Sequence, residues 1–193
     1  RQFGMDLEEV LERAAAAGVA QIIQVFLSPQ AWSEGKELFA RHPEVFFILG
    51  THPTEAMQYD RSTEDGMREA IREDSRIRGI GEIGLDYYWK DCPPEMQKDV
   101  LLRQLALARS LALPVVIHCR DAEQDCFSIL EAEGFSNYPL LWHCFGGNIH
   151  MADRIVGNGW HLSVPGPVTF PATEALREAV ASVPLDRLLV ETD

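Results

Sequence analysis

Residues 77–118 read IRGIGEIGLDYYWKDCPPEMQKDVLLRQLALARSLALPVVIH. Short apolar runs at 77–85 and 113–118 predict two buried strands. Between them, residues 94–112 carry apolar side chains at the helical 3.6-residue period, and a proline pair marks the helix start. A strand–helix–strand unit of this kind predicts two parallel strands in one sheet.

The same alternation of strand and helix extends along the whole chain. Further strands are expected at 19–27, 45–50, 139–143, 159–164 and 187–193, and further helices at about 6–17, 29–40, 59–74, 122–133, 148–156 and 172–181. Seven strands fit an open doubly wound sheet or an eight-stranded barrel lacking one strand. The first strand–helix turn, LSPQA at 27–31, has no glycine-rich phosphate loop, which disfavours the doubly wound sheet. We therefore predict an α/β fold, a TIM-like (β/α) barrel with seven of eight strands, as a single domain over 1–193.

Composition limits the classes of partner. The formal net charge of −13 argues against tight, sequence-independent binding of duplex DNA. It does not exclude a nuclease, because metal ions and a few local cations can hold phosphates. The four cysteines have no CxxC spacing and indicate reduced thiols in a cytoplasmic protein. No apolar run is long enough to span a bilayer, and the sequence indicates no obligate protein partner.

Five potential metal ligands lie at or just beyond the ends of five predicted strands: His52, Glu82, His118, His143 and Asp193. In a barrel these strand ends converge on one face, where active sites form. Imidazole and carboxylate ligands suit zinc, manganese and similar divalent ions. Glu82 can bridge two such ions, and Asp193 can accept the proton of a metal-activated water.

Each of these residues also has a structural interpretation. A single histidine after a strand is usually a hydrogen-bonded structural residue, whereas Glu82 within an apolar strand needs a partner. The shared position of all five favours a metal site. His150 and His161 do not fit the pattern and are interpreted as structural or surface residues.

Several motifs resemble the TatD family of metal-dependent deoxyribonucleases. They are LGTHP (49–53), GEIGLDYY (81–88), LPVVIHCRDA (113–122), LLWHCFGG (140–147) and LLVETD (188–193). The resemblance covers nearly the whole chain. It implies a TIM-like barrel that hydrolyses DNA, as a 3′→5′ exonuclease on single-stranded ends, with divalent Mg, Mn or Zn ions, two per intact site.

The resemblance also assigns roles to residues. It implies that Glu82, His118, His143 and Asp193 are metal ligands, and that Glu82 and Asp193 are catalytic. His52 would contact substrate phosphate. Arg120 would also bind phosphate, although an ion pair with Asp121 or another structural ion pair fits equally well. In the segment 86–88, an aromatic side chain could stack on a base or anchor the loop.

The chain departs from the family pattern at several points. It has no H-x-H pair, and it stops at Asp193, so we interpret it as truncated at both ends. Pro171 replaces a frequent lysine and Gly147 a frequent serine. We expect the second metal to bind poorly to residues 1–193.

Two other functions remain open. The same metal chemistry could hydrolyse a small ester, amide or lactone, or the chain could be an inactive metal-binding or interaction module. A basic or aromatic groove beside the metal would favour DNA, and a small closed apolar pocket would favour the small-molecule hydrolase.

Overall fold

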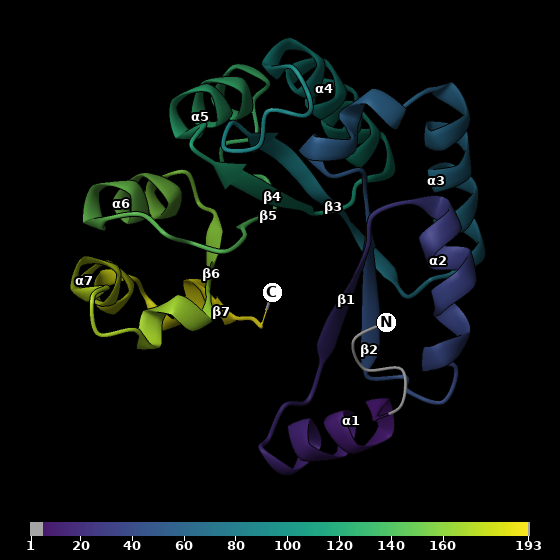
Figure 1. Ribbon diagram of the computed structural model, residues 1–193, viewed down its shortest axis with the longest axis horizontal. Helices are drawn as coiled ribbons and strands as arrows, with labels where there is room; N and C mark the ends of the chain where they lie inside the picture. The colour runs from purple at the N-terminus through teal and green to yellow at the C-terminus, as the bar shows by residue number, and fades with distance from the viewer. Residues whose placement is uncertain (1–5, 193) are drawn as a thin grey trace.

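The sheet contains seven parallel strands in sequential order. The structure, a computed structural model, describes residues 6–192. The strands are β1 (Ile22–Phe26), β2 (Val45–Leu49), β3 (Ile77–Asp86), β4 (Val115–Arg120), β5 (Leu140–Trp142), β6 (His161–Val164) and β7 (Leu188–Val190). Figure 1 shows them curled into an open half-barrel with helices on the outside, so the predicted fold class is confirmed. Within residues 6–192, β1 pairs only with β2, and β7 only with β6.

Seven α-helices connect these strands or flank them in the described residues. They are α1 (Leu7–Ala16), α2 (Pro29–Gly35), α3 (Arg61–Glu73), α4 (Pro94–Leu111), α5 (Glu123–Ala132), α6 (Ile149–Gly157) and α7 (Glu174–Ser182). Short 3₁₀ helices are η1 (Lys36–Phe39), η2 (Pro53–Gln58), η3 (Gly166–Thr169) and η4 (Leu185–Arg187). The helix expected at 29–40 is therefore split into α2 and η1. The other 3₁₀ turns were not predicted because they are too short for a periodic pattern.

Local sequence explains where several helices begin and end. The Ser28 hydroxyl accepts a hydrogen bond from the Ala31 N–H at 3.1 Å and caps α2, and Asp60 caps α3 through the Thr63 N–H at 2.9 Å. Helix α4 starts at a proline and ends where Ala112 takes a left-handed conformation.

Strand β3 contains an irregularity at Glu82. Ile80 pairs with Val115 and Ile83 with Ile117, so β3 holds one more residue than β4 over this stretch. A bulge of this kind bends a strand and changes the direction of a side chain. Because of the bulge, the Glu82 side chain does not follow the in-and-out alternation of side chains that buries its apolar neighbours.

Two expected positions need correction. Glu82 and His118 were expected at the C-terminal ends of their strands, but β3 continues to Asp86 and β4 to Arg120. Strand β3 runs one residue past the expected 77–85, β4 lies two residues later than the expected 113–118, and Gly84, with φ of +150°, pairs with His118 within this stretch. The ligands therefore lie inside the wall of the half-barrel.

No disulfide links the four cysteines, all of which lie in the described residues. None of the helices in residues 6–192 combines the length and apolar composition needed to cross a bilayer. The cytoplasmic location stays a prediction.

Candidate metal centre

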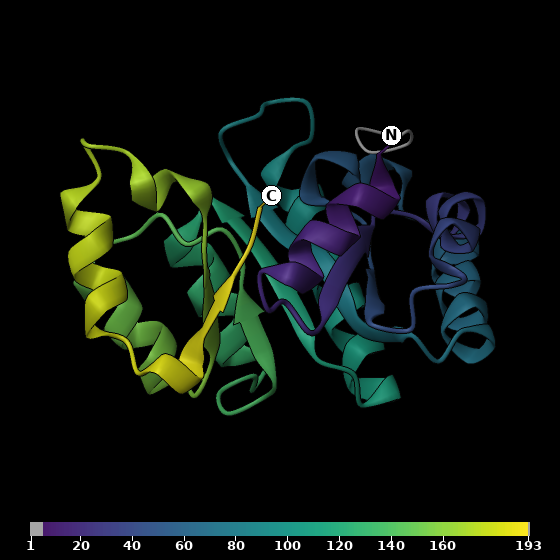
Figure 2. The ribbon, with the colours of Figure 1, turned by 90° about the horizontal axis from the view of Figure 1, so that it is seen from below.

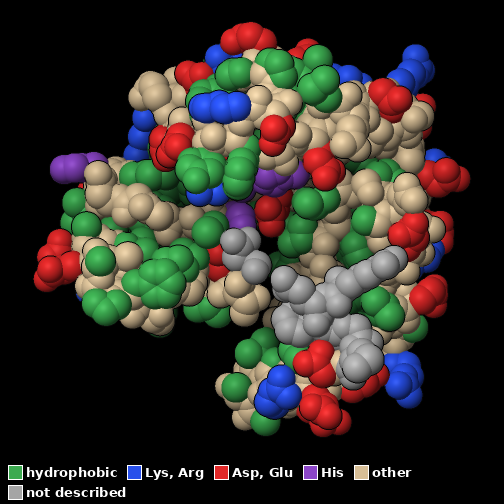
Figure 3. Space-filling model, in the orientation of Figure 1, with side chains coloured by type: hydrophobic (Ala, Val, Ile, Leu, Met, Phe, Trp, Pro, Cys, Tyr) green, Lys and Arg blue, Asp and Glu red, His purple; other side chains and the backbone are tan. Residues whose placement is uncertain are grey.

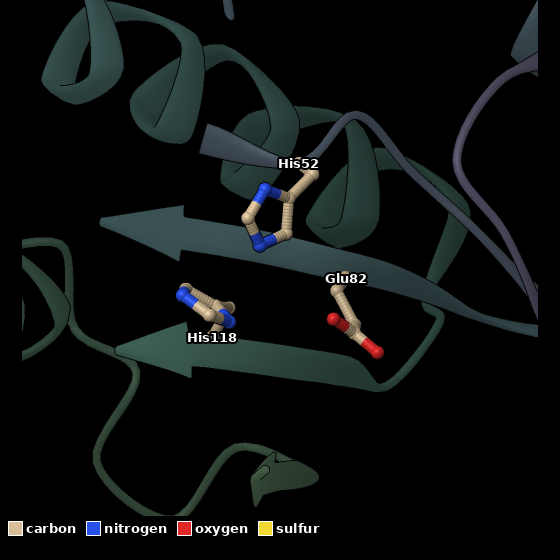
Figure 4. A group of neighbouring side chains, drawn as sticks. All are labelled: His52, Glu82 and His118. Atoms are coloured by element: carbon tan, nitrogen blue, oxygen red, sulfur yellow. The ribbon is translucent and has the colours of Figure 1, made fainter. Parts of the chain in front are cut away.

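His52, Glu82 and His118 form one group of potential metal ligands. Each offers one ligand atom, and these three atoms lie within 4.8 Å of one another. Figure 4 shows the three side chains converging from the segment after β2, from β3 and from β4. All three are partly buried. Two imidazoles and a carboxylate are a donor set that binds a divalent transition ion.

His118 is held in place by the buried carboxylate of Asp86. Oδ2 of Asp86 lies 3.0 Å from Nε2 of His118, and the Asp86 side chain is only 2% exposed. Oδ1 of Asp86 accepts hydrogen bonds from the N–H groups of Tyr88 and Trp89, each at 3.0 Å. A carboxylate on one ring nitrogen fixes the orientation of a metal-ligating histidine.

His143, Cys144 and Glu191 form a second group with ligand atoms within 4.8 Å. Nδ1 of His143 lies 2.6 Å from Oε2 of Glu191. The same oxygen accepts hydrogen bonds from the Cys144 N–H at 3.2 Å and from the Ser163 hydroxyl. Nε2 of His143 lies 3.5 Å from Oε1 of Glu82. Glu82 thus lies between the two groups.

Burial and neighbouring charges set the protonation of the site. Burial lowers the pKa of His52 to about 4. The charge of His118 contributes to this shift, whereas the charge of Asp86 acts in the opposite direction. His52 is therefore neutral at pH 7, the state that binds metals. Burial raises the pKa of Asp86, but hydrogen bonds from Trp89 and His118 outweigh it and leave that pKa below its ordinary value. Asp86 is accordingly ionised at neutral pH.

A cavity of about 320 Å³ opens beside the histidines. Its lining includes His118, Arg120, Glu123, Trp142, His143 and Met151. In Figure 3, histidine and acidic side chains face one another in a hollow at the centre of the visible face. The mixed polar and apolar lining differs from a closed apolar pocket.

The structure brings together four of the five predicted strand-end residues, His52, Glu82, His118 and His143. Asp193 lies outside the described residues. Arg120 is exposed, and its guanidinium carbon lies 3.7 Å from the centre of the Tyr88 ring. Within residues 6–192 it makes no ion pair with Asp121.

Sequence reasoning missed two residues of the cluster, Asp86 and Glu191. Each directly follows an apolar run in the sequence, which is the signal that selected the other candidates. From the sequence, Asp86 is interpreted as part of a loop, and the LLVETD motif points to Asp193 rather than to Glu191. His150 and His161 belong to neither ligand group in the described residues.

Comparisons with known proteins identify the family of the chain. Residues 1–193 match the family model described as TatD related DNase. The uncharacterized metal-dependent hydrolase YabD of Bacillus subtilis is 37% identical over 193 residues, which are all of this chain and 75% of that protein. The 3′-5′ ssDNA/RNA exonuclease TatD of Escherichia fergusonii is 30% identical over 193 residues, with 100% and 74% coverage. The crystal structure of the TatD homolog YjjV from Escherichia coli superposes with a TM-score of 0.89 at 30% identity, covering 99% of this chain and 74% of that one. The chain belongs to the TatD-related DNase family of metal-dependent hydrolases.

Proposed function

We propose that the protein is a metal-dependent phosphodiesterase that removes nucleotides from the 3′ ends of single-stranded DNA. The observation that supports this most directly is the joined ligand cluster, in which Glu82 lies between the His52–His118 pair and His143. The name of the Escherichia fergusonii relative points to single-stranded nucleic acid as the substrate class.

The donor set fits divalent ions. Neutral imidazoles and carboxylates match zinc and manganese. The position of Glu82 between the two ligand groups supports our proposal that two ions would share it. We propose Glu82, His118, His143 and Asp193 as the ligands. His52, which the resemblance assigns to substrate phosphate, lies close enough to Glu82 and His118 to serve as a further ligand. A bound ion would supply Lewis-acid activation of the phosphate and of the attacking water.

The chain's own residues orient these groups. Asp86 fixes the ring of His118, and Glu191 fixes the ring of His143 through Nδ1. We assign proton acceptance from water to Asp193 and phosphate binding to Arg120, which lines the cavity beside His118. A charged, open cavity supports a phosphodiester substrate over a small apolar ester or lactone.

The test is metal-dependent cleavage of a 5′-labelled single-stranded oligonucleotide. Chelator-stripped protein is incubated with Mg²⁺, Mn²⁺ or Zn²⁺, and we expect a ladder of stepwise shortened products. Phosphorothioate linkages at the 3′ end should block the ladder if the polarity is 3′→5′.

Glu82→Ala and His118→Ala should abolish cleavage, whereas His150→Ala should not, because His150 lies outside both ligand groups. Circular dichroism checks that each variant is folded. A folded, metal-loaded protein that cleaves no oligonucleotide but hydrolyses an ester or lactone would replace this proposal with the small-molecule hydrolase. Failure with all substrates would indicate the inactive module.

A further inference from the structure

We propose that Tyr88 and Trp89, together with Arg120, form a stacking platform for the unpaired bases at the 3′ end of the nucleic acid. This inference rests on the proposed function and identifies how the same site recognises its substrate. It separates the roles of Tyr87 and Tyr88, which the sequence left open, and adds Trp89.

The three aromatics of the β3–α4 loop have different environments. The Tyr87 hydroxyl donates to Oδ2 of Asp125 at 2.8 Å, and its ring packs against the core, so Tyr87 anchors the loop. Tyr88 and Trp89 are 49% and 51% exposed. Their rings meet edge to face, with centroids 5.0 Å apart and an interplanar angle of 88°. Two large adjacent rings are thus presented to solvent.

Arg120 adds a cation to the platform. Its guanidinium carbon lies 3.7 Å from the Tyr88 ring centre, and the residue lines the cavity that holds His118 and His143. In a protein of net charge −13, a cation beside the ligand cluster offers a local contact for a phosphate. Aromatic faces with an adjacent arginine are the usual combination for binding single-stranded nucleic acids.

A single side chain fixes the platform relative to the ligand cluster. Asp86 accepts the N–H groups of Tyr88 and Trp89 through Oδ1 and contacts His118 through Oδ2. The Gln97 side chain, on α4, accepts a hydrogen bond from the Asp86 N–H at 2.7 Å and donates one to the Asp86 carbonyl at 2.8 Å. Figure 2 shows this loop, in teal, projecting past the ends of the strands. The aromatic rings are therefore tied to the ligand side of the sheet.

Exposed apolar residues are common on proteins and often have no function. Leu38 of η1 is 60% exposed and lies before β2, at the opposite end of the strands. Tyr88 and Trp89 differ because they are adjacent to each other, to a cation and to the ligand cluster. A nucleobase fits them because any base has a face that can stack, which suits an enzyme that removes nucleotides in sequence.

The test combines protein variants with altered substrates. A fluorescein-labelled single-stranded oligothymidine is titrated with protein in the presence of chelator, so that binding is measured without cleavage. The same titration uses an oligonucleotide with abasic residues at its 3′ end. We expect Trp89→Ala to weaken binding of the normal oligonucleotide about 5- to 100-fold. Trp89→Phe should restore most of it, and Leu38→Ala should bind like the wild type.

The abasic substrate distinguishes stacking from a structural effect. Missing bases should weaken binding to the wild type by a similar factor and should weaken binding to Trp89→Ala clearly less, because only Tyr88 remains to stack. Equal weakening by abasic residues in the wild type and in Trp89→Ala would overturn the platform, as would unchanged binding by Trp89→Ala. If the wild type binds in this base-dependent way but never cleaves, the platform stands and the nuclease proposal fails. If it cleaves and Trp89→Ala behaves like the wild type, the nuclease stands and the platform fails.

Discussion

The Asp86 carboxylate contacts His118 through one oxygen, at 3.0 Å from Nε2, and holds the β3–α4 loop through the other. Asp86→Asn keeps an acceptor for the two loop N–H groups but removes the charge on the imidazole. We expect metal affinity to fall about 10- to 100-fold while the fold is retained. Calorimetric titration of Mn²⁺ or Zn²⁺ into chelator-stripped protein measures this. Asp153→Asn, at an exposed position of α6, is the control. An unchanged dissociation constant would show that Asp86 serves the loop alone.

Glu191 should contribute to stability through its charge. Burial raises its pKa, but hydrogen bonds from His143 and Ser163 outweigh burial, so the pKa lies below its ordinary value. A carboxylate with a lowered folded-state pKa stabilises the protein above its unfolded pKa, and this stabilisation is lost as the pH falls through the folded-state value.

Glu191→Gln should therefore reduce the free energy of unfolding by about 1–3 kcal/mol at pH 7, with a smaller reduction at pH 3.5. Urea denaturation of metal-free protein at both pH values measures it. Glu12→Gln, at an exposed position of α1, should have little effect. An equal reduction in the free energy of unfolding at both pH values would mean that the charge of Glu191 is not the cause.

Helix α4 supports the site through two buried glutamines seven residues apart. Gln104 accepts from the Thr51 N–H at 2.8 Å and donates to the Thr51 carbonyl at 3.0 Å, directly before His52. Gln97 makes the equivalent pair with Asp86. Gln104→Leu would leave both Thr51 backbone groups without these partners, so we expect a loss of about 2–4 kcal/mol. Urea denaturation measures it, with exposed Gln124→Leu as the matched control. Equal midpoints for the two variants would contradict the prediction.

The strands could be predicted from local patterns in the sequence. The convergence of His52, Glu82, His118 and His143 could be predicted for the same reason. A short apolar run ends in a polar residue, and barrel topology brings such ends together. The bulge at Glu82 could not be predicted, since it depends on the register between β3 and β4, which involves residues about 35 positions apart.

Which histidine each of the carboxylates of Asp86 and Glu191 contacts could not be predicted either. Asp86 contacts His118 across 32 residues, and Ser163 contacts Glu191 across 28. Side-chain direction in the folded sheet decides whether a carboxylate coordinates a metal or contacts a ring nitrogen of a histidine ligand. The sequence identifies candidates for the cluster and leaves their division of roles open.

Gly84 is required by the close approach of β3 and β4. Its φ is +150°, and a Cβ there would lie 1.8 Å from the carbonyl oxygen of His118. Gly84→Ala would force backbone against backbone, so we expect a loss of more than about 3 kcal/mol or failure to fold. Gly157→Ala is the control, because a Cβ at this α6 position meets nothing within 4 Å. We expect it to be neutral or slightly stabilising. Thermal unfolding of both variants provides the comparison, and similar stability for the two would contradict the assigned packing.

His52 should make the metal-free protein sensitive to mild acid. Burial and the charge of His118 lower its pKa to about 4, from 6.5 in an unfolded chain. Between these values the unfolded state binds a proton that the folded state does not, so stability falls as the pH is lowered from about 6.5 towards 4. His52→Asn removes this titration. The wild type should therefore lose up to about 2 kcal/mol more than the variant between pH 7 and pH 5. Urea denaturation of chelator-treated protein at pH 7, 6 and 5 measures the difference, and an NMR titration of the His52 ring assigns it. Parallel stability curves would show that the His52 ring is solvated enough to titrate near its ordinary pKa.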